Sequence, residues 1–156
     1  MNFVKYLTTA AVLSVCAANA NAESFDFEHV SCSGKANEIR LVIEGLKDSI
    51  GLVTVDLYKN DNENFLKRAG RVGRLRAAAR APRTSVCIHA PADGEYAIAV
   101  YHDENANKDF DKGAFGLPAE PWGISNNPRV RFGPPPVEQA LFKVDAEGAE
   151  VVIQLN

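Results

Sequence analysis

The 156-residue chain lacks most sequence patterns that identify enzymes and membrane proteins. It has no C-x-x-C motif, which argues against a thioredoxin-like redox site, and its three histidines do not stand at the spacing of a zinc pair. It has neither a G-x-S-x-G nucleophile motif nor a glycine-rich phosphate loop. It also has no apolar run of the roughly 20 residues that a transmembrane helix needs, so we expect no transmembrane segment.

The longest apolar run lies near the start of the chain, at residues 7–18. Lys5 precedes it, and Ala20-Asn21-Ala22 follows it as an A-x-A cleavage signal. A charged start, a short apolar core and a cleavage signal are typical of a secretory signal peptide. We therefore predict a signal peptide at residues 1–22, a mature domain at 23–156, and a periplasmic or secreted protein. The alternative is a lipoprotein attached at Cys16, but bulky Val15 stands where a small residue is usual.

Cleavage would remove Cys16 and leave an even pair, Cys32 and Cys87. In an exported chain such a pair favours a disulfide, and two free thiols are the alternative. The formal net charge of the whole chain is −3, which does not suit a polyanionic partner. We expect no binding to nucleic acid.

Alternating apolar and polar residues dominate the remaining chain, and turn residues bound each alternating run. This pattern predicts an all-β fold: a single antiparallel β-sandwich, immunoglobulin-like or transthyretin-like, of six to eight strands with one long ordered loop. Short turns at 45–51, 91–94 and 146–148 are interpreted as antiparallel hairpins. Strands are expected at 39–44, 53–58, 86–88, 96–100, 141–144 and 151–155, with a further one at 25–27.

Residues 67–83 contain seven basic residues and no acidic one. Arginine, leucine and alanine favour helix, so a helical turn or two is expected at 75–81 within a long surface connection. We expect this arginine-rich segment to be solvated. The alternative is that it binds phosphate or anionic glycans of the envelope.

Short oxygen-bearing side chains recur at every second residue just after the strand at 96–100. At this spacing the side chains can converge on a hard cation, so the sequence predicts a calcium site. The proposed ligands are Asp103, Asn105, Asn107, Asp109 and Asp111.

These residues fill alternate positions of the twelve-residue EF-hand loop, but two key positions differ. Lys108 replaces the glycine of the sharp turn, and Ala114 replaces the bidentate glutamate. Glu104, Glu120 or backbone carbonyls would have to complete the ligand shell. The alternative is an Asn/Asp-rich turn whose side chains bond to their own backbone.

The acidic residues open a long connection, 103–136, that holds six of the eight prolines. Several aromatic and aliphatic side chains in it can pack on the sandwich, so we expect the connection to be folded and not a disordered linker. Loops this long in a compact domain are usually functional. The connection is therefore our main candidate for a binding surface.

Several motifs resemble those of a family of uncharacterised exported bacterial proteins, domain of unknown function 2141. The similarity covers roughly residues 38–156, and the chain departs from it at Lys108, where relatives tend to have glycine. The resemblance implies export and a β fold, but no activity. The motifs are Gly94–Asp111, Phe115–Pro118, Glu120–Gly123, Ser125–Asn127 and Arg131–Pro135.

Three hypotheses for function remain at this point. The first is an exported β-sandwich module of the bacterial envelope that binds an unknown ligand or protein through the 103–136 loop, with calcium ordering the loop. The second is a hydrolase acting on an envelope component, with His102 and Asp103 as acid/base candidates in a pocket. The third is a structural accessory subunit with an exposed apolar patch.

Overall fold

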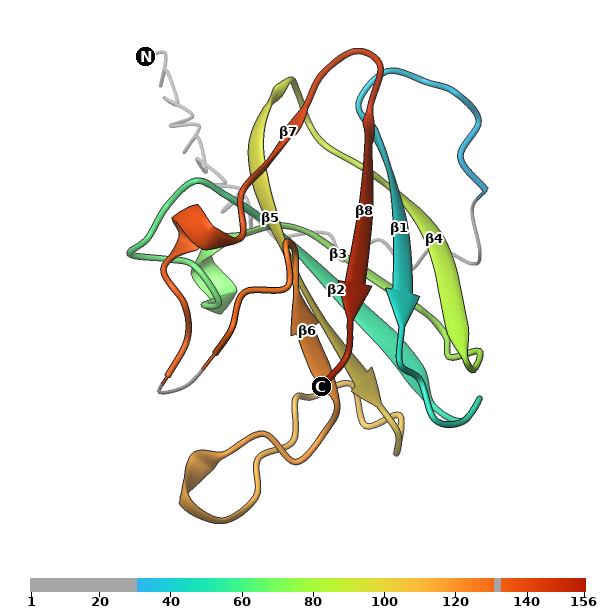
Figure 1. Ribbon diagram of the computed structural model, residues 1–156, viewed down its shortest axis with the longest axis vertical. Coiled ribbons are helices and arrows are strands. Elements are labelled where there is room, and N and C mark those ends of the chain that lie inside the picture. Colours follow the sequence, from blue (N-terminus) through green and yellow to red (C-terminus); the bar gives the residue numbers. More distant parts are fainter. Residues whose placement is uncertain (1–30, 131–132) are drawn as a thin grey trace, which may run out of the picture.

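The computed structural model describes residues 31–130 and 133–156. The expected signal peptide and the expected strand at 25–27 lie outside these residues and stay predictions. The described chain forms eight strands in two sheets that face each other across an apolar core (Figure 1). The predicted all-β sandwich is therefore confirmed.

One sheet has three strands and the other has five. The smaller sheet has the order β4–β1–β8, with β4 at Arg83–His89, β1 at Glu38–Glu44 and β8 at Ala149–Gln154. The larger sheet has the order β3–β2–β5–β6, with β7 also paired to β5. Its strands are β3 at Arg71–Ala78, β2 at Leu52–Lys59, β5 at Gly94–Asp103, β6 at Trp122–Ile124 and β7 at Phe142–Val144.

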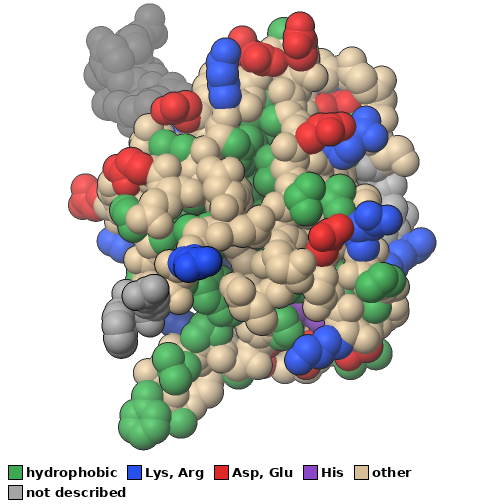
Figure 2. Space-filling view, viewed as in Figure 1, with side chains coloured by type: hydrophobic (Ala, Val, Ile, Leu, Met, Phe, Trp, Pro, Cys, Tyr) green, Lys and Arg blue, Asp and Glu red, His purple; other side chains and the backbone are tan. Residues whose placement is uncertain are grey.

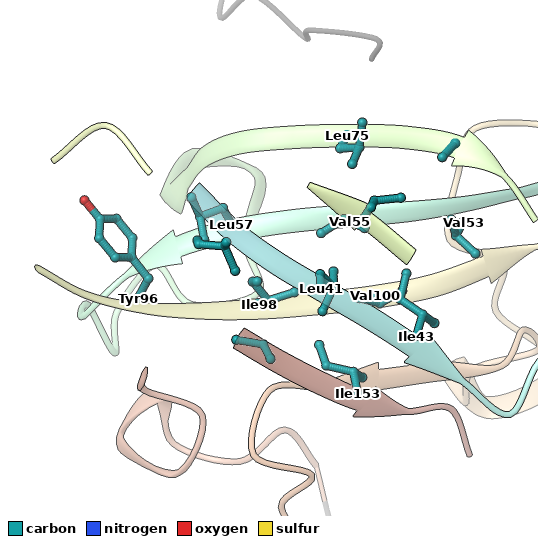
Figure 3. Packing of buried hydrophobic residues seen from close by; sticks show 14 of the residues in the cluster. Leu41, Ile43, Val53, Val55, Leu57, Leu75, Tyr96, Ile98, Val100 and Ile153 are labelled. Atoms are coloured by element: carbon teal, nitrogen blue, oxygen red, sulfur yellow. The ribbon is translucent and has the colours of Figure 1, made fainter. Parts of the chain in front are cut away.

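The period-two residues form the core between the sheets (Figure 3). On β1, Ile39, Leu41 and Ile43 are fully buried, whereas Arg40 between them is exposed. Successive side chains of a strand point to opposite faces, so alternation selects the buried face. The labelled core residues in Figure 3 come from β1, β2, β3, β5 and β8, which shows that both sheets supply the core.

The short turns do not form the predicted hairpins, and this part of the prediction was wrong. The turn at 45–51 joins β1 of the small sheet to β2 of the large one, and the turns at 91–94 and 146–148 also connect different sheets. Each turn therefore crosses the thickness of the sandwich. In addition, β1 pairs with β8 in parallel, from Ile39 opposite Ala149 to Glu44 opposite Gln154, so the pairing is not purely antiparallel.

The helical turn expected at 75–81 is absent, and the arginine-rich segment is not one long loop. A short 3-10 helix at Arg68–Gly70 precedes a strand. This strand, β3, is antiparallel to β2 and forms because Leu75 and Ala77 alternate with arginines and bury against the core. Helix propensity was the wrong guide here, since tertiary burial of the alternate residues overrides it. The expectation that the whole segment is solvated was also wrong.

Two arginines of β3, Arg71 and Arg74, lie on the outer face of the large sheet and contact one buried carboxylate. Arg74 contacts Asp56 of β2 through Nε at 2.6 Å and through a second nitrogen at 2.8 Å, and Arg71 Nε lies 2.9 Å from the same carboxylate. Asp56 is only 4% exposed. Burial, followed by the charge of Asp56, raises the pKa of neighbouring Tyr58 to about 12, so its hydroxyl stays neutral.

A second apolar cluster covers the other end of this outer face. Phe65 from the β2–β3 connection packs edge-on against Tyr58, and Val137 and Ala140 from the segment before β7 join them. Connecting segments thus cover much of the outer face of the large sheet. On the outer face of the small sheet Arg40 and Glu150 are exposed, whereas Cys87, which is bonded to Cys32, is buried.

Cys32 and Cys87 are joined by a disulfide, with their Cα atoms 5.2 Å apart. It fastens the segment before β1 to the edge strand β4. Within the described ranges, no helix has both the length and the apolar character needed to cross a membrane.

Candidate functional site

Strand β5 ends at His102 and Asp103, which begin the 103–136 connection. His102 is completely buried, and its Nε2 donates to the carbonyl of Ile50 at 2.7 Å. Within the described residues its Nδ1 has no hydrogen-bond partner, and the carboxylate of Glu104 lies 3.9 Å from it. A side chain enclosed in this way does not meet a substrate, so His102 serves to hold the 45–51 turn against β5.

Asp103, also completely buried, organises the backbone of the loop that follows. Its Oδ1 accepts the backbone N–H of Asn107 at 3.0 Å, and its Oδ2 accepts that of Lys108 at 2.7 Å. Asn105 Oδ1 accepts the same Asn107 N–H at 2.9 Å, and Asn107 Oδ1 accepts the N–H of Asp109 at 2.8 Å. The alternating oxygens therefore wind the chain into a compact turn, the behaviour expected of Asx residues.

Lys108 does not prevent the tight turn, although glycine is usual at this position of a calcium loop. It adopts a left-handed conformation with φ of 69°, the kind of conformation that glycine would supply without strain. Its carbonyl accepts hydrogen bonds from Arg76 at 3.1 Å and from the hydroxyl of Tyr101 at 3.4 Å. Contacts with β3 and β5 thus hold the strained residue in place.

Asp111 closes the turn. The side-chain amide of Asn105 donates to its carboxylate at 2.7 Å, and that of Asn107 donates at 3.0 and 3.1 Å. The backbone N–H of Asp111 in turn donates to Oε2 of Glu120 at 3.0 Å. Four of the five proposed ligands are therefore linked in one network, whereas Asp109 contributes only its backbone N–H.

Glu120 was one of several groups that the sequence offered to complete the ligand shell. In the structure its carboxylate faces the loop. Glu120 is 7% exposed, and its Oε1 has no hydrogen-bond partner among residues 31–130 and 133–156. Burial raises the pKa of Glu120, and the nearby carboxylates of Asp103 and Asp111 raise it further. A buried carboxyl beside other carboxylates lacks a positive partner, a condition that a cation or a proton would relieve.

The carboxylate oxygens of the loop lie farther apart than the ligands of one bound ion would. Oxygens about 2.4 Å from one calcium ion lie within about 4.8 Å of each other. Over residues 31–130 and 133–156, the one set of three acidic, histidine or cysteine ligand atoms this close is Cys32, Glu38 and Cys87, and its two sulfurs are bonded to each other. Calcium binding would therefore require the side chains of the loop to move inward.

Beyond Asp111 the chain forms a narrow projection that ends in an apolar tip, which we define as residues 113–119. Every residue of the tip is exposed, Phe115 completely and Leu117 by 65%. The segment between β5 and β6 extends away from the two sheets in Figure 1, and hydrophobic side chains gather at its end in Figure 2.

After the projection, Ser125, Asn126 and Asn127 clamp the strands together. Ser125 Oγ accepts from Ile98 N–H at 2.9 Å and donates to the Ala140 carbonyl at 2.6 Å. Asn127 pairs with the free edge of β8, accepting the N–H of Gln154 and donating to the carbonyl of Val152. These polar residues are therefore structural. A shallow groove beside them is lined by Trp122, Ile124, Asn127, Pro128, Val130, Gln154 and Asn156.

A family model described as an uncharacterized protein conserved in bacteria (DUF2141) matches residues 41–152. The chain belongs to this family. The match spans β1 to β8 and includes the loop network, the apolar tip and the Ser125–Asn127 clamp. No curated protein and no solved structure matches the chain. The resemblance noted from the motifs is therefore confirmed.

Proposed function

We propose that this DUF2141 protein is a binding module of the bacterial envelope, periplasmic or secreted, whose β5–β6 connection is ordered by calcium and contacts a ligand or partner. The observation that carries the proposal is the buried carboxyl of Glu120 beside Asp103 and Asp111, one oxygen of which has no partner in the part of the chain that the structure describes. The disulfide between Cys32 and Cys87 supports an oxidising compartment outside the cytoplasm.

The proposed calcium ligands are oxygens of Asp103, Asn105, Asn107, Asp111 and Glu120, with Asp109 and backbone carbonyls or water completing the shell. Calcium takes six to eight oxygen ligands at flexible geometry, so a partly formed loop suits it better than it suits magnesium. The ion would replace the amide groups of Asn105 and Asn107 as the positive partner of Asp111. Glu120 would supply the carboxylate that the twelfth position of an EF-hand loop lacks here.

The expected affinity is weak, with a dissociation constant on the order of 10⁻⁴ M, as in extracellular modules. At about 1 mM calcium, mass action then stabilises the folded protein by about 1.4 kcal/mol. Asp109 is the best residue to change, because its carboxylate is exposed and its only hydrogen bond in the loop comes from the backbone. Asp103→Ala is a poorer test, since it also removes two hydrogen bonds to the loop backbone.

Calorimetric titration with calcium and melting curves in calcium or chelator test the proposal. We expect heat of binding and a higher Tm in calcium for the wild type, and weaker binding with a smaller rise in Tm for Asp109→Ala. Glu147→Gln is the matched control, because it removes one exposed carboxylate on the β7–β8 turn and should leave the calcium response unchanged. No heat, together with superimposable melting curves, would reduce the loop to an Asn/Asp-rich turn.

The two alternative functions fare differently. The hydrolase hypothesis needs His102 in a pocket, but His102 is buried and bonded to Ile50, and the groove near Trp122 does not include it. The accessory-subunit hypothesis needs an exposed apolar patch, and Phe115 with Leu117 provides a small one. A binding role through the projecting loop accommodates this patch as well.

A further inference from the structure

We propose that the apolar tip, residues 113–119, inserts into the interfacial layer of a phospholipid bilayer with anionic headgroups. This inference deepens the proposed function, on which it rests, by assigning the partner of the same loop. Three observations carry it: the composition of the tip, the pairing of its backbone, and the charges at its base.

The tip has the sequence Gly-Ala-Phe-Gly-Leu-Pro-Ala and contains no polar side chain. Seven consecutive exposed residues without a polar side chain are unusual on a protein that faces only water. Phe115 holds a left-handed conformation, with φ of 60°, while its ring is completely exposed. The protein thus exposes the largest side chain of the tip to solvent.

The tip also pairs most of its own backbone N–H groups, which insertion between lipids requires because few other partners are available there. Gly113 donates to Leu117 at 2.8 Å, Gly116 to Gly113 at 3.3 Å, and Leu117 to Ala114 at 3.5 Å. At the base, Ala119 donates to Asp111 at 2.9 Å, and position 118 is proline, which has no N–H. A segment built to extend a sheet of a protein partner would instead leave these groups free.

The charges next to the tip suit phosphate groups. Lys112 is exposed and directly precedes the tip. Lys108 is also exposed, but exposed Glu104 and Asp109 on the same loop offset its charge, so Lys112 is the lysine that serves the tip. The carboxylate of Asp111 accepts hydrogen bonds from the side-chain amides of Asn105 and Asn107 and so faces into the loop. A narrow convex projection with two large apolar side chains enters a fluid bilayer without a preformed pocket, and Lys112 then lies at the headgroups.

Sedimentation of the purified protein with lipid vesicles tests this proposal. The vesicles contain either phosphatidylcholine alone or phosphatidylcholine mixed with phosphatidylglycerol, with calcium or chelator. We compare the wild type with the double variant Phe115→Asn and Leu117→Ser. Asparagine tolerates the left-handed conformation of position 115, so the variant should fold. Its melting curve in solution verifies this point.

We expect the wild type to bind the anionic vesicles and the double variant to bind them about tenfold or more weakly. Lys112→Gln should weaken binding about fivefold on anionic vesicles and little on neutral ones. The matched control is Val152→Ser, which removes an equally apolar, half-exposed side chain from β8 and should bind like the wild type. Tryptophan at position 115 (Phe115→Trp) should shift its fluorescence to the blue when anionic vesicles are added.

Absence of wild-type binding to both vesicle types overturns the proposal, and so does equal binding by the double variant, which would indicate headgroup attraction alone. If the wild type does not bind vesicles but is cross-linked from position 115 to an envelope protein, the tip binds a protein pocket and the lipid proposal is rejected. Calcium heat without vesicle binding would reject the lipid proposal and keep the calcium site. Vesicle binding without calcium heat, equal in chelator, would reject the calcium site and keep the tip.

Discussion

The outer faces of the two sheets carry similar ion pairs in different surroundings. On the small sheet, Arg40 and Glu150 lie 3.4 Å apart with side chains 60% and 81% exposed. On the large sheet, Arg74 and Asp56 lie 2.6 Å apart with side chains 17% and 6% exposed. Water screens the first pair, so it contributes little. The second pair is enclosed, so removing one partner leaves a buried charge without its counter-charge.

The side chains of Tyr58, Arg71 and Arg74 enclose Asp56, and connecting segments cover the neighbouring part of the same face. The β2–β3 connection and the segment before β7 lie on the large sheet. On the small sheet, the segment before β1 covers Cys87 through the disulfide, but the side chains of Arg40 and Glu150 stay exposed. Covering a face makes its polar groups dependent on their partners. The comparison therefore predicts where single substitutions are costly and where they are not.

The largest loss of stability is expected from removing the disulfide. The ion pairs on the outer face of the small sheet are exposed and contribute little, so the cross-link stabilises this edge more than they do. The double variant Cys32→Ser and Cys87→Ser should lose about 4 kcal/mol of unfolding free energy, as expected for a cross-link that closes a loop of 55 residues. Urea unfolding of the variant, and of the wild type with and without reductant, measures the loss. An unchanged midpoint in all three samples would mean that the cross-link does not hold this edge.

Asp56→Ala should cost about 3 kcal/mol, because it leaves Arg74 and Arg71 without their shared carboxylate on a covered face. The matched control is Glu44→Ala, which breaks the exposed pair with Arg83 and should cost less than about 0.5 kcal/mol. Thermal and urea unfolding compare the two variants. Equal losses would contradict the distinction between a covered and an open face.

Glu120 provides a contrast with Asp56. Both carboxyl groups are buried, but Asp56 pairs with arginines, whereas Glu120 has no basic partner among the described residues. Its pKa is raised in the folded state, so its contribution to stability is present below the ordinary glutamate pKa of about 4.3 and is lost as the pH rises through the raised value. In chelator at pH 7, Glu120→Gln should therefore have a Tm a few degrees above that of the wild type.

The same Glu120→Gln variant should lose that advantage when calcium is added, because calcium stabilises only the wild type if Glu120 is a ligand. The measurement is the difference in Tm between the two proteins at pH 4 to 8, in chelator and in calcium. The difference isolates Glu120 from the other carboxyl groups that titrate in this range. A variant that is less stable than the wild type in chelator would show that the carboxylate already has a partner.

For strands such as β1 the sequence allowed the buried face to be predicted, but not the neighbouring strands. Ile39, Leu41 and Ile43 alternate because one side of β1 meets the core, and that pattern is local. Whether the turn at 45–51 returns within a sheet or crosses to the other depends on the packing of the whole domain. The turn residues are compatible with both, so the predicted hairpins were wrong.

The ion pairs of Asp56 could have been predicted from the alternation of polar and apolar residues, but the high arginine content of the segment favoured a helix instead. Asp56 alternates with the core residues Val55 and Leu57, so it points away from the core, and Arg74 alternates in the same way with Leu75. Reading that alternation instead of the helix propensity of arginine would have predicted a strand there. The burial of Glu120 had no such local signal, because it depends on the projection folding back toward Asp111.

The parallel pairing of β1 with β8 has a consequence for the order of events during synthesis. The centre of the small sheet is β1, near the start of the domain, and one of its two partners is the last strand of the chain. Buried residues of β1 therefore have no neighbour on that side until Val151 and Ile153 have been made. A chain released before residue 149 would carry a hydrophobic central strand with an open edge, which is the kind of surface that aggregates.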